Sequence, residues 1–422
     1  MRTLAYILIC STPFWSLPLI PGTYSAVTPY FGALLGAIFI ISKVRSFSYT
    51  SALVSIYFLF LLIIYSFYSY YIQQFNFAYT LAYFVGFLCF PGFYYAFNLI
   101  GREHLFNCLL KLSRLFSIVA IVEFFLSKTS MLHPLKIAIT SFITGSDKAG
   151  FVLTTNEPSW AVQLLLFISV FIFLNYLENK NRFDVFLLFT NATIFMLVFS
   201  MTGFIVLVVS LSFYFIVFSK VSLGSLFKYS ICILMSFFAV SIVYSFFNQG
   251  GYTFSRISNL AMINTDNIYD MYYMIIAIDN SLLIRIGYPV VGLNMIVDYP
   301  YGYGISGFSY NLHNYTDLVH SPIMYESELT RHLRDLNADP RNFIIRIGVD
   351  FGIAGLFLFL FVFSHQIRLA KSLFETSLLP ALLLSLSFGV MMQFSTFYFF
   401  LYPFTYAFLL FLRDLKCQER KY

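Results

Sequence analysis

The sequence predicts an all-α polytopic integral membrane protein, with about a dozen transmembrane helices and one large, partly helical loop outside the hydrocarbon. Apolar residues make up 59% of the 422 residues and charged residues only 10%, whereas a soluble domain carries about a quarter charged residues. The mean hydropathy is +0.80. A water-soluble fold with so few charges would have little to cover its surface. We therefore expect residues 1–422 to form a single membrane domain.

Each apolar run of about 17–25 residues is long enough to cross a bilayer as a helix. The first run follows Met1 and Arg2 without a convincing cleavage site, and we expect it to stay as an uncleaved first helix. The closely spaced pairs that meet at Thr202 and Phe394 are expected to be tight hairpins. The expected helices lie near Leu4–Ile20, Ala26–Ile41, Ser51–Tyr71, Phe77–Ile100, Leu105–Leu126, Ser159–Leu177, Asp184–Ser200, Thr202–Phe218, Tyr229–Phe247, Phe351–Arg368, Ser377–Gln393 and Ser395–Leu412.

The distribution of Lys and Arg orients this bundle, because loops on the cytoplasmic side carry an excess of both. With the N-terminus in the cytoplasm, the even-numbered connections and the C-terminal tail also lie inside. Among the shorter loops, only the one at residues 128–158 breaks this pattern. The basic residues that fall inside are Arg2, Lys43, Arg45, Arg102, Lys180, Arg182, Lys220, Lys228, Arg368, Lys371, Arg413, Lys416, Arg420 and Lys421.

Two segments then lie outside: residues 128–158 and residues 248–350, between helices nine and ten. The second is too long for a passive connection, since loops above about 12–15 residues are usually functional or disordered. It has no low-complexity run, and Tyr269–Asn280 and Pro322–Leu336 look helical. We expect an ordered periplasmic cap.

The composition also excludes several function classes. The net charge of +6 comes from basic residues scattered between apolar runs, which sets topology and does not indicate nucleic-acid binding. The five cysteines show neither a CxxC pair nor metal spacing. No cluster of His, Asp or Glu suggests a metal, and no motif suggests a bound cofactor. The cysteines are Cys10, Cys89, Cys108, Cys232 and Cys417.

Glu157 is the first candidate for chemistry, because it stands just before an apolar helix at its outer end. Pro158 suits the start of that helix, where the helix dipole is positive. Glu157 could be a capping acid at the interface, or a general acid/base or sugar ligand facing outward. Glu123 is the lone acid inside an expected span, and it lies near enough to the outer end of its helix to reach the interface.

The large outer loop holds a set of basic residues that could clamp a diphosphate, because a guanidinium offers a planar fork of two donors. Acidic residues are about as numerous in this loop, so a solvated surface with ordinary ion pairs is the alternative. The basic residues are Arg256, Arg285, His320, Arg331, Arg334, Arg341 and Arg346.

With these features in place, the chain resembles the bacterial O-antigen polymerases of the Wzy type and, more distantly, the O-antigen ligases. Each matching motif is short, and it is their order along the whole chain that carries the resemblance. The four motifs are Asn156-Glu157-Pro158-Ser159, the helix break at Ser200-Met201-Thr202-Gly203, Arg285 followed by Gly292 and Tyr299–Phe308, and Arg341-Asn342-Phe343-Ile344 leading into residues 348–355.

The resemblance implies a glycosyltransferase that joins undecaprenyl-diphosphate-linked oligosaccharide units at the periplasmic face of the inner membrane. It implies no cofactor and no metal, and a partner protein that controls chain length. Glu157, Arg285 and Arg256 would be catalytic. The substrate-binding residues would be Arg341, His320, Asn156 and Asn342.

Two departures from the family pattern bear on mechanism. Met201 stands where relatives often have Arg, and Arg341 stands before Asn342 where relatives often have His. His320 could substitute for that histidine. The alternatives are an O-antigen ligase with a lipid A-core acceptor, or a flippase for lipid-linked oligosaccharides. A flippase would be expected to bury charges along a central cavity and to have short loops, whereas here the polar residues gather in one outer loop.

Overall fold

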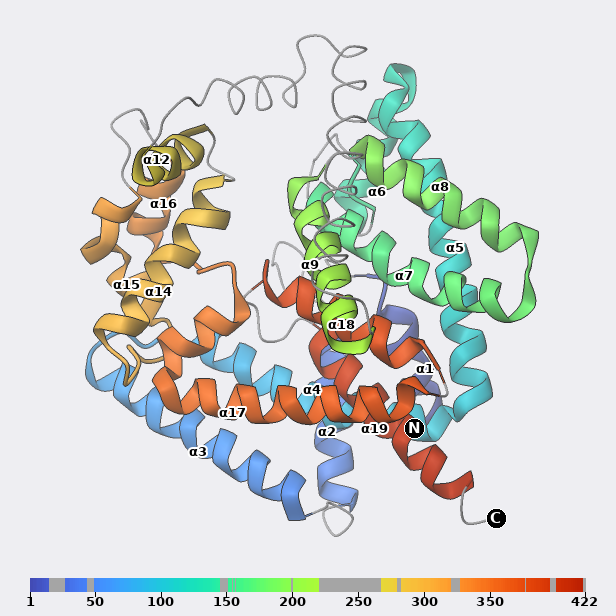
Figure 1. Ribbon diagram of the computed structural model, residues 1–422, viewed down its shortest axis with the longest axis horizontal. Coiled ribbons are helices and arrows are strands. Elements are labelled where there is room, and N and C mark those ends of the chain that lie inside the picture. The colour runs from blue at the N-terminus through green and yellow to red at the C-terminus, as the bar shows by residue number, and fades with distance from the viewer. Residues whose placement is uncertain are drawn as a thin grey trace.

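The computed structural model describes residues 1–14, 27–43, 49–144, 151–153, 155, 157–198, 200–219, 267–278, 282–319, 327–375, 377–394 and 400–419, and every regular element in these ranges is helical (Figure 1). The expected span Tyr229–Phe247 lies outside the described residues. The bundle helices are α1 (Arg2–Ser11), α2 (Val27–Lys43), α3 (Tyr49–Tyr71), α4 (Phe77–Ile100), α5 (Arg102–Lys128), α6 (His133–Thr144), α7 (Pro158–Asn179), α8 (Arg182–Val198), α9 (Met201–Phe218), α17 (Phe343–Phe374), α18 (Leu379–Met391) and α19 (Leu401–Glu419).

The large loop is partly helical where it is described, as its sequence predicts. Its second expected helix, Pro322–Leu336, is described only from residue 327 onward. The elements of the loop are α12 (Ile268–Ile278), the π-helical turn η3 (Leu283–Gly287), α14 (Tyr288–Asp298), α15 (Gly307–Asn311), η4 (Leu312–Leu318) and α16 (Ser327–Asp335).

Four helices in the described part are long and apolar enough to cross a bilayer, and several shorter apolar helices accompany them. The chain is a multi-pass membrane protein, and the full dozen of spans stays a prediction. The four candidate spans are Leu53–Tyr71, Phe77–Ile100, Pro158–Asn179 and Phe343–Phe374.

Three elements differ most from the sequence prediction. The first expected helix, Leu4–Ile20, is α1, which ends at Ser11; Pro13 directly after the C-cap Thr12 cannot continue the helical hydrogen bonds. The outer segment 128–158 contains α6, which the sequence reading treated as plain loop. Helix ten was expected to begin at Phe351, but α17 begins at Phe343 because the Asn342 side chain caps it, accepting from the Ile344 and Ile345 N–H groups at 3.0 and 3.1 Å. The expected start coincides instead with a kink inside α17, at Gly352.

Small residues and aromatic rings hold the bundle together. Gly36 of α2 and Gly92 of α4 lie where the two backbones approach so closely that a Cβ on either would strike the other helix, the close packing that small residues allow between membrane helices. Nearby, Phe97 of α4 stacks edge-on against Phe404 and Phe408 of α19, with ring centroids 5.3 and 5.7 Å apart. All three rings are fully buried.

The loop helices gather at one side of the molecule beside α3 and the start of α17, while α5 to α9 form the opposite side (Figure 1). The loop has its own apolar core, in which Tyr288, Val291 and Met295 of α14 are fully buried. Tyr65 and Ser69 of α3 donate hydrogen bonds to loop carbonyls. The loop is therefore docked onto the ends of the bundle helices.

The far end of the bundle gathers the C-terminal basic residues. Arg102, at the start of α5, pairs with Glu419 of α19 at 2.9 Å, and Lys416 donates to the Ser372 carbonyl at the end of α17 at 2.7 Å. The C-terminal ends of α17 and α19 thus meet the start of α5. This end carries basic residues that the sequence assigns to the cytoplasm, and the loop docks at the other end.

Candidate active site

The kink in α17 is where two of the sequence motifs meet. Gly352 has φ 61° and ψ −155°, a conformation open essentially to glycine alone. The kink interrupts the hydrogen bonds within α17. The glycine-rich segment 299–304 forms hydrogen bonds with the backbone groups that the kink leaves without helical partners. The bonds run from Tyr303 N to Val349 O (2.7 Å), from Gly304 N to Asp350 O (3.1 Å) and from Ile353 N to Pro300 O (2.9 Å).

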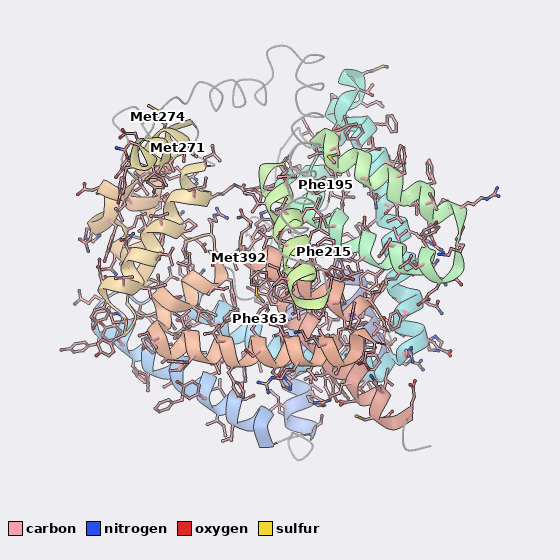
Figure 2. All side chains as sticks on the ribbon, viewed as in Figure 1. Phe195, Phe215, Met271, Met274, Phe363 and Met392 are labelled. Atoms are coloured by element: carbon pink, nitrogen blue, oxygen red, sulfur yellow. The ribbon has the colours of Figure 1, made fainter. Side chains whose placement is uncertain are left out.

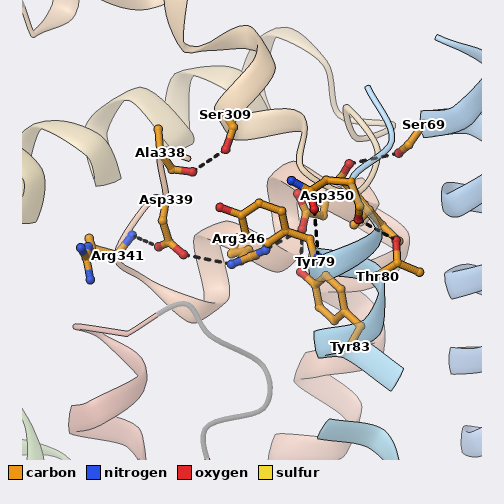
Figure 3. A network of polar contacts seen from close by, with 12 residues as sticks. Ser69, Tyr79, Thr80, Tyr83, Ser309, Ala338, Asp339, Arg341, Arg346 and Asp350 are labelled. Carbon is orange, nitrogen blue, oxygen red and sulfur yellow. Dashed lines mark hydrogen bonds and ion pairs between the residues drawn. The ribbon is translucent and has the colours of Figure 1, made fainter. Parts of the chain in front are cut away.

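A buried polar network joins the first turns of α17 to α4 (Figure 3). Arg346, whose side chain is 7% exposed, pairs with Asp339 at 2.9 Å and with Asp350 at 3.4 Å. Tyr83 of α4 donates to the same Asp350 oxygen at 2.6 Å. The guanidinium also lies over the Tyr79 ring, 4.5 Å from its centroid, a favourable cation–π geometry. The network fixes the start of α17 against the bundle.

Arg341 lies at the edge of this network in a strained conformation. Its φ is 51°, which costs a residue with a side chain about 1 kcal/mol or more. The Asp339 carboxylate accepts the Arg341 backbone N–H at 2.8 Å, while the Arg341 side chain extends away from Arg346 (Figure 3). Among the described residues, the Arg341 guanidinium makes no ion pair with a carboxylate.

Arg341 thereby differs from two other arginines that the sequence placed in the diphosphate-binding set. Arg346 is neutralised by two aspartates, and Arg334 is exposed and pairs with the adjacent Asp335 at 2.8 Å. Arg334 thus fits the alternative of a solvated ion pair, whereas Arg346 forms a buried ion-pair network.

Glu157 begins α7 without capping it. It occupies the N-cap position, but its side chain makes no capping hydrogen bond, so the simple capping interpretation is wrong. One carboxylate oxygen accepts from the Ser159 hydroxyl at 3.2 Å. Thr155 donates to both the Val152 and Glu157 carbonyls, which closes the turn before the helix. The half-buried carboxylate remains available for other contacts.

Glu123 supports the segment that leads to Glu157. Its side chain accepts the Val152 N–H at 2.9 Å, within the segment that the sequence places on the outer side. It also lies 3.9 Å from the ammonium of Lys136, which α6 turns inward and which is 1% exposed. The segment before α7 is thus tied to both α5 and α6.

The starts of α7 and α17 lie on either side of one aromatic layer. Trp160 of α7 packs edge-on against Phe394, with centroids 5.1 Å apart. Tyr402 of α19 donates to the Phe394 carbonyl at 3.1 Å, and its ring lies 4.9 Å from that of Phe343, the first residue of α17. The layer links the helix starts that carry Glu157 and Arg341.

Asn342 contacts this layer from the α17 side. Its amide nitrogen lies 3.4 Å from the sulfur of Met392, just beyond α18. Figure 2 shows Met392 between the loop helices and the bundle. The Asn342 side-chain oxygen caps α17, and a role of this residue in substrate binding stays a prediction.

Of the remaining predicted residues, the structure describes only Arg285. Arg285 lies in the π-helical turn η3, half-buried, between residues of the loop core. Arg256, His320 and Asn156 lie outside the described residues. In the described part, Arg341 and Asn342 are adjacent at the start of α17, and the aromatic layer links them to the start of α7 that carries Glu157.

His332 is a feature that the sequence reading missed. Its ring is 6% exposed, and Nδ1 lies 2.8 Å from the Tyr288 hydroxyl. Burial first, and then the neighbouring charges of Arg331 and Arg341, lower its pKa to about 4, while Asp339 and Asp335 oppose this shift. The available signal was spacing, since Leu329 and His332 lie three residues apart on the buried face of one helix.

We expect this histidine to make the loop sensitive to acid. Between pH 6.5 and about 4 the unfolded chain binds a proton that the folded loop excludes, so stability falls as the pH drops through this window. The full difference corresponds to about 3 kcal/mol. Thermal unfolding in detergent from pH 7 to 4 measures it. The His332→Gln variant should lose less stability on acidification, and an equal loss in both proteins would contradict the assignment.

No group of three or more His, Cys, Asp or Glu residues in the described part could hold a metal ion.

A family comparison matches residues 185–360 to the O-antigen ligase family, a range that runs from the first turn of α8 into α17. No curated protein matches the chain. The match confirms the family resemblance of the sequence, and it includes the large loop, Arg341 and the kink at Gly352.

Proposed function

Because the chain carries an O-antigen ligase family domain over residues 185–360, we propose that it is a glycosyltransferase that polymerises O-antigen. The donor is a growing glycan on undecaprenyl diphosphate. The acceptor is the terminal sugar of a lipid-linked repeat unit at the outer face of the inner membrane. The observation that carries this proposal is the pair of helix starts at one end of the bundle, one with a carboxylate and one with an arginine that makes no ion pair among the described residues.

The proposed reaction is a displacement at the anomeric carbon of the donor sugar. An acceptor hydroxyl oxygen bonds to that carbon, and the bond from carbon to diphosphate oxygen breaks. The hydroxyl proton passes to the Glu157 carboxylate, which acts as general base. The electron pair leaves with the lipid diphosphate, whose developing charge Arg341 stabilises. Arg285 and the undescribed Arg256 and His320 could contribute further contacts to the diphosphate, as the sequence predicts.

The ligase family match favours a second candidate, an O-antigen ligase that transfers finished polymer to lipid A-core. The chemistry at the donor is the same in both cases, and only the acceptor differs. A flippase is supported less, because the family domain belongs to transfer enzymes by its name and the candidate residues sit at one end of the bundle.

Deletion of the gene in its host, followed by electrophoresis of the lipopolysaccharide, separates these functions. Loss of the long ladder with a retained core-plus-one-unit band supports the polymerase. Loss of every O-unit band, with polymer held on the lipid carrier, identifies a ligase. Single units stranded on the cytoplasmic side identify a flippase. An unchanged ladder would overturn the O-antigen assignment altogether.

We expect Glu157→Gln to lower polymerisation by about 100- to 10,000-fold, because the amide cannot accept the proton. The change is isosteric and keeps the contact with Ser159, so the amount of protein in the membrane should not change. Chain length and rate are measured with membranes and purified lipid-linked units. Glu178→Gln, at the other end of the same helix and exposed, is the matched control. Full activity of Glu157→Gln would remove Glu157 as the base.

A further inference from the structure

The Asp339 carboxylate contacts two arginines, the backbone of Arg341 and the side chain of Arg346. One oxygen accepts the backbone N–H of Arg341 at 2.8 Å, and the other accepts from the guanidinium of Arg346 at 2.9 Å. Arg346 therefore neutralises the negative charge of Asp339. Within the described part of the chain, Asp339 makes no ion pair with the side chain of Arg341, two residues away. The Arg341 guanidinium points away from this pair (Figure 3).

The local sequence explains how this arrangement forms. Asp339-Pro340-Arg341 is an Asx turn, in which an aspartate side chain accepts the N–H two residues on. Pro340 fixes its own φ and is buried. The turn is held at its start by Ser309, which donates to the Ala338 carbonyl at 2.6 Å. At its end it runs directly into the capped first turn of α17.

We propose that Asp339 is a positioning residue for Arg341. By accepting the Arg341 N–H it holds that residue at φ 51°. By pairing with Arg346 it leaves the Arg341 guanidinium without a carboxylate partner among the described residues, so that this group can bind the substrate diphosphate. This inference rests on the proposed function, since it assigns the role of Asp339 through that of Arg341. Strain held in place by surrounding bonds is a common way to orient a functional side chain.

Three substitutions of Asp339 separate the effect of its hydrogen bond in the turn from the effect of its negative charge. Asn keeps the side-chain oxygen of an Asx turn but loses the charge, Glu keeps the charge but is too long for the turn, and Ala loses both. We expect Asp339→Asn to retain most polymerising activity per folded molecule. Asp339→Glu and Asp339→Ala should lose about 10- to 100-fold, because misplacement by about 1 Å costs that much. Activity in the Glu variant with loss in the Asn variant would overturn the proposal.

A double variant tests whether Asp339 acts through Arg341. In the Arg341→Ala background, the further change Asp339→Ala should leave the residual activity per folded molecule unchanged. A further drop of tenfold or more would show that Asp339 acts independently, which contradicts the proposal. If Arg341→Ala alone has full activity, the proposed function of Arg341 fails. If Arg341→Ala is inactive and Asp339→Ala is fully active, only the inference about Asp339 fails.

Amide hydrogen exchange on the full-length protein in detergent gives a readout that does not depend on activity. The Arg341 amide should lose protection in Asp339→Ala and keep it in Asp339→Asn, while the amides of α14 exchange at the wild-type rate in both. Retained protection of the Arg341 amide in Asp339→Ala would show that other contacts hold the turn, and the proposal would be wrong. Faster exchange throughout α14 in Asp339→Ala would assign Asp339 to general stability instead.

Discussion

Gly352→Ala is expected to destabilise the protein by roughly 3–5 kcal/mol, enough to remove most of it from the membrane fraction. The backbone at Gly352 is open essentially to glycine alone, which accounts for about 1–3 kcal/mol of this loss. The remainder comes from a clash. A Cβ at this position would lie 2.7 Å from the Gly302 nitrogen and closer still to the Pro300 carbonyl oxygen, and both are backbone atoms that cannot rotate away.

Gly101→Ala is the matched control for this clash. Gly101 has φ 81° and ψ 161° between α4 and α5, a similar glycine conformation, but no atom lies within 4 Å of a Cβ built there. Its substitution should lower the stability of the protein only by the contribution from the backbone conformation, without the contribution from a clash. The two variants are compared by immunoblot of membranes and by thermal unfolding in detergent. Equal losses in both would mean that segment 299–304 does not pack against the kink as described.

Much of the helical framework follows from the sequence, since apolar run length sets where a helix lies in a membrane. The expected span Phe77–Ile100 matches α4 at both ends, and Asn76 caps it as its position before the apolar run suggests. Where the sequence reading was wrong, side-chain chemistry outweighed hydropathy. The polar residues before Phe351 looked like loop, but Asn342 caps α17 early and Arg346 and Asp350 pair within its first turns.

The site was harder to predict, because hydropathy and spacing along the chain do not show which charges find partners. Glu157 stood out as an acid before an apolar helix, and Arg341 stood out as a basic residue of the large loop and as part of the fourth motif of the resemblance. The resemblance named Arg341 and not Arg346, five residues later, but neither hydropathy nor spacing showed that only Arg346 of the two would be paired with aspartates. The difference comes from Asp339 and from Tyr83, which is distant in the chain and contacts Asp350 only after α4 and α17 pack together. The Asp-Pro pair before Arg341 was the available local signal for a turn.

Arg341→Ala is expected to lower polymerisation by about 100- to 1,000-fold, the usual effect of removing a donor aimed at developing charge. Arg341→Lys keeps the positive charge but loses the two-donor fork, so it should retain an intermediate activity. Neither change removes a side-chain ion pair within the described part of the chain. The amount of folded protein should therefore stay at the wild-type level. Arg334→Ala, which removes an exposed pair with a neighbouring aspartate, is the matched control and should be fully active.

Arg341→Gly gives the most discriminating result, because it reverses the usual relation between activity and stability. Glycine adopts φ 51° without a Cβ penalty. The variant should therefore be as inactive as Arg341→Ala, yet more stable than Arg341→Ala by up to about 1 kcal/mol. Thermal unfolding in detergent and the polymerisation assay on the same preparation measure both quantities. A residue kept for packing would lose stability in both variants. Loss of activity in Arg341→Gly without a loss of stability relative to the wild type is expected where the Arg341 side chain is kept for activity and not for packing.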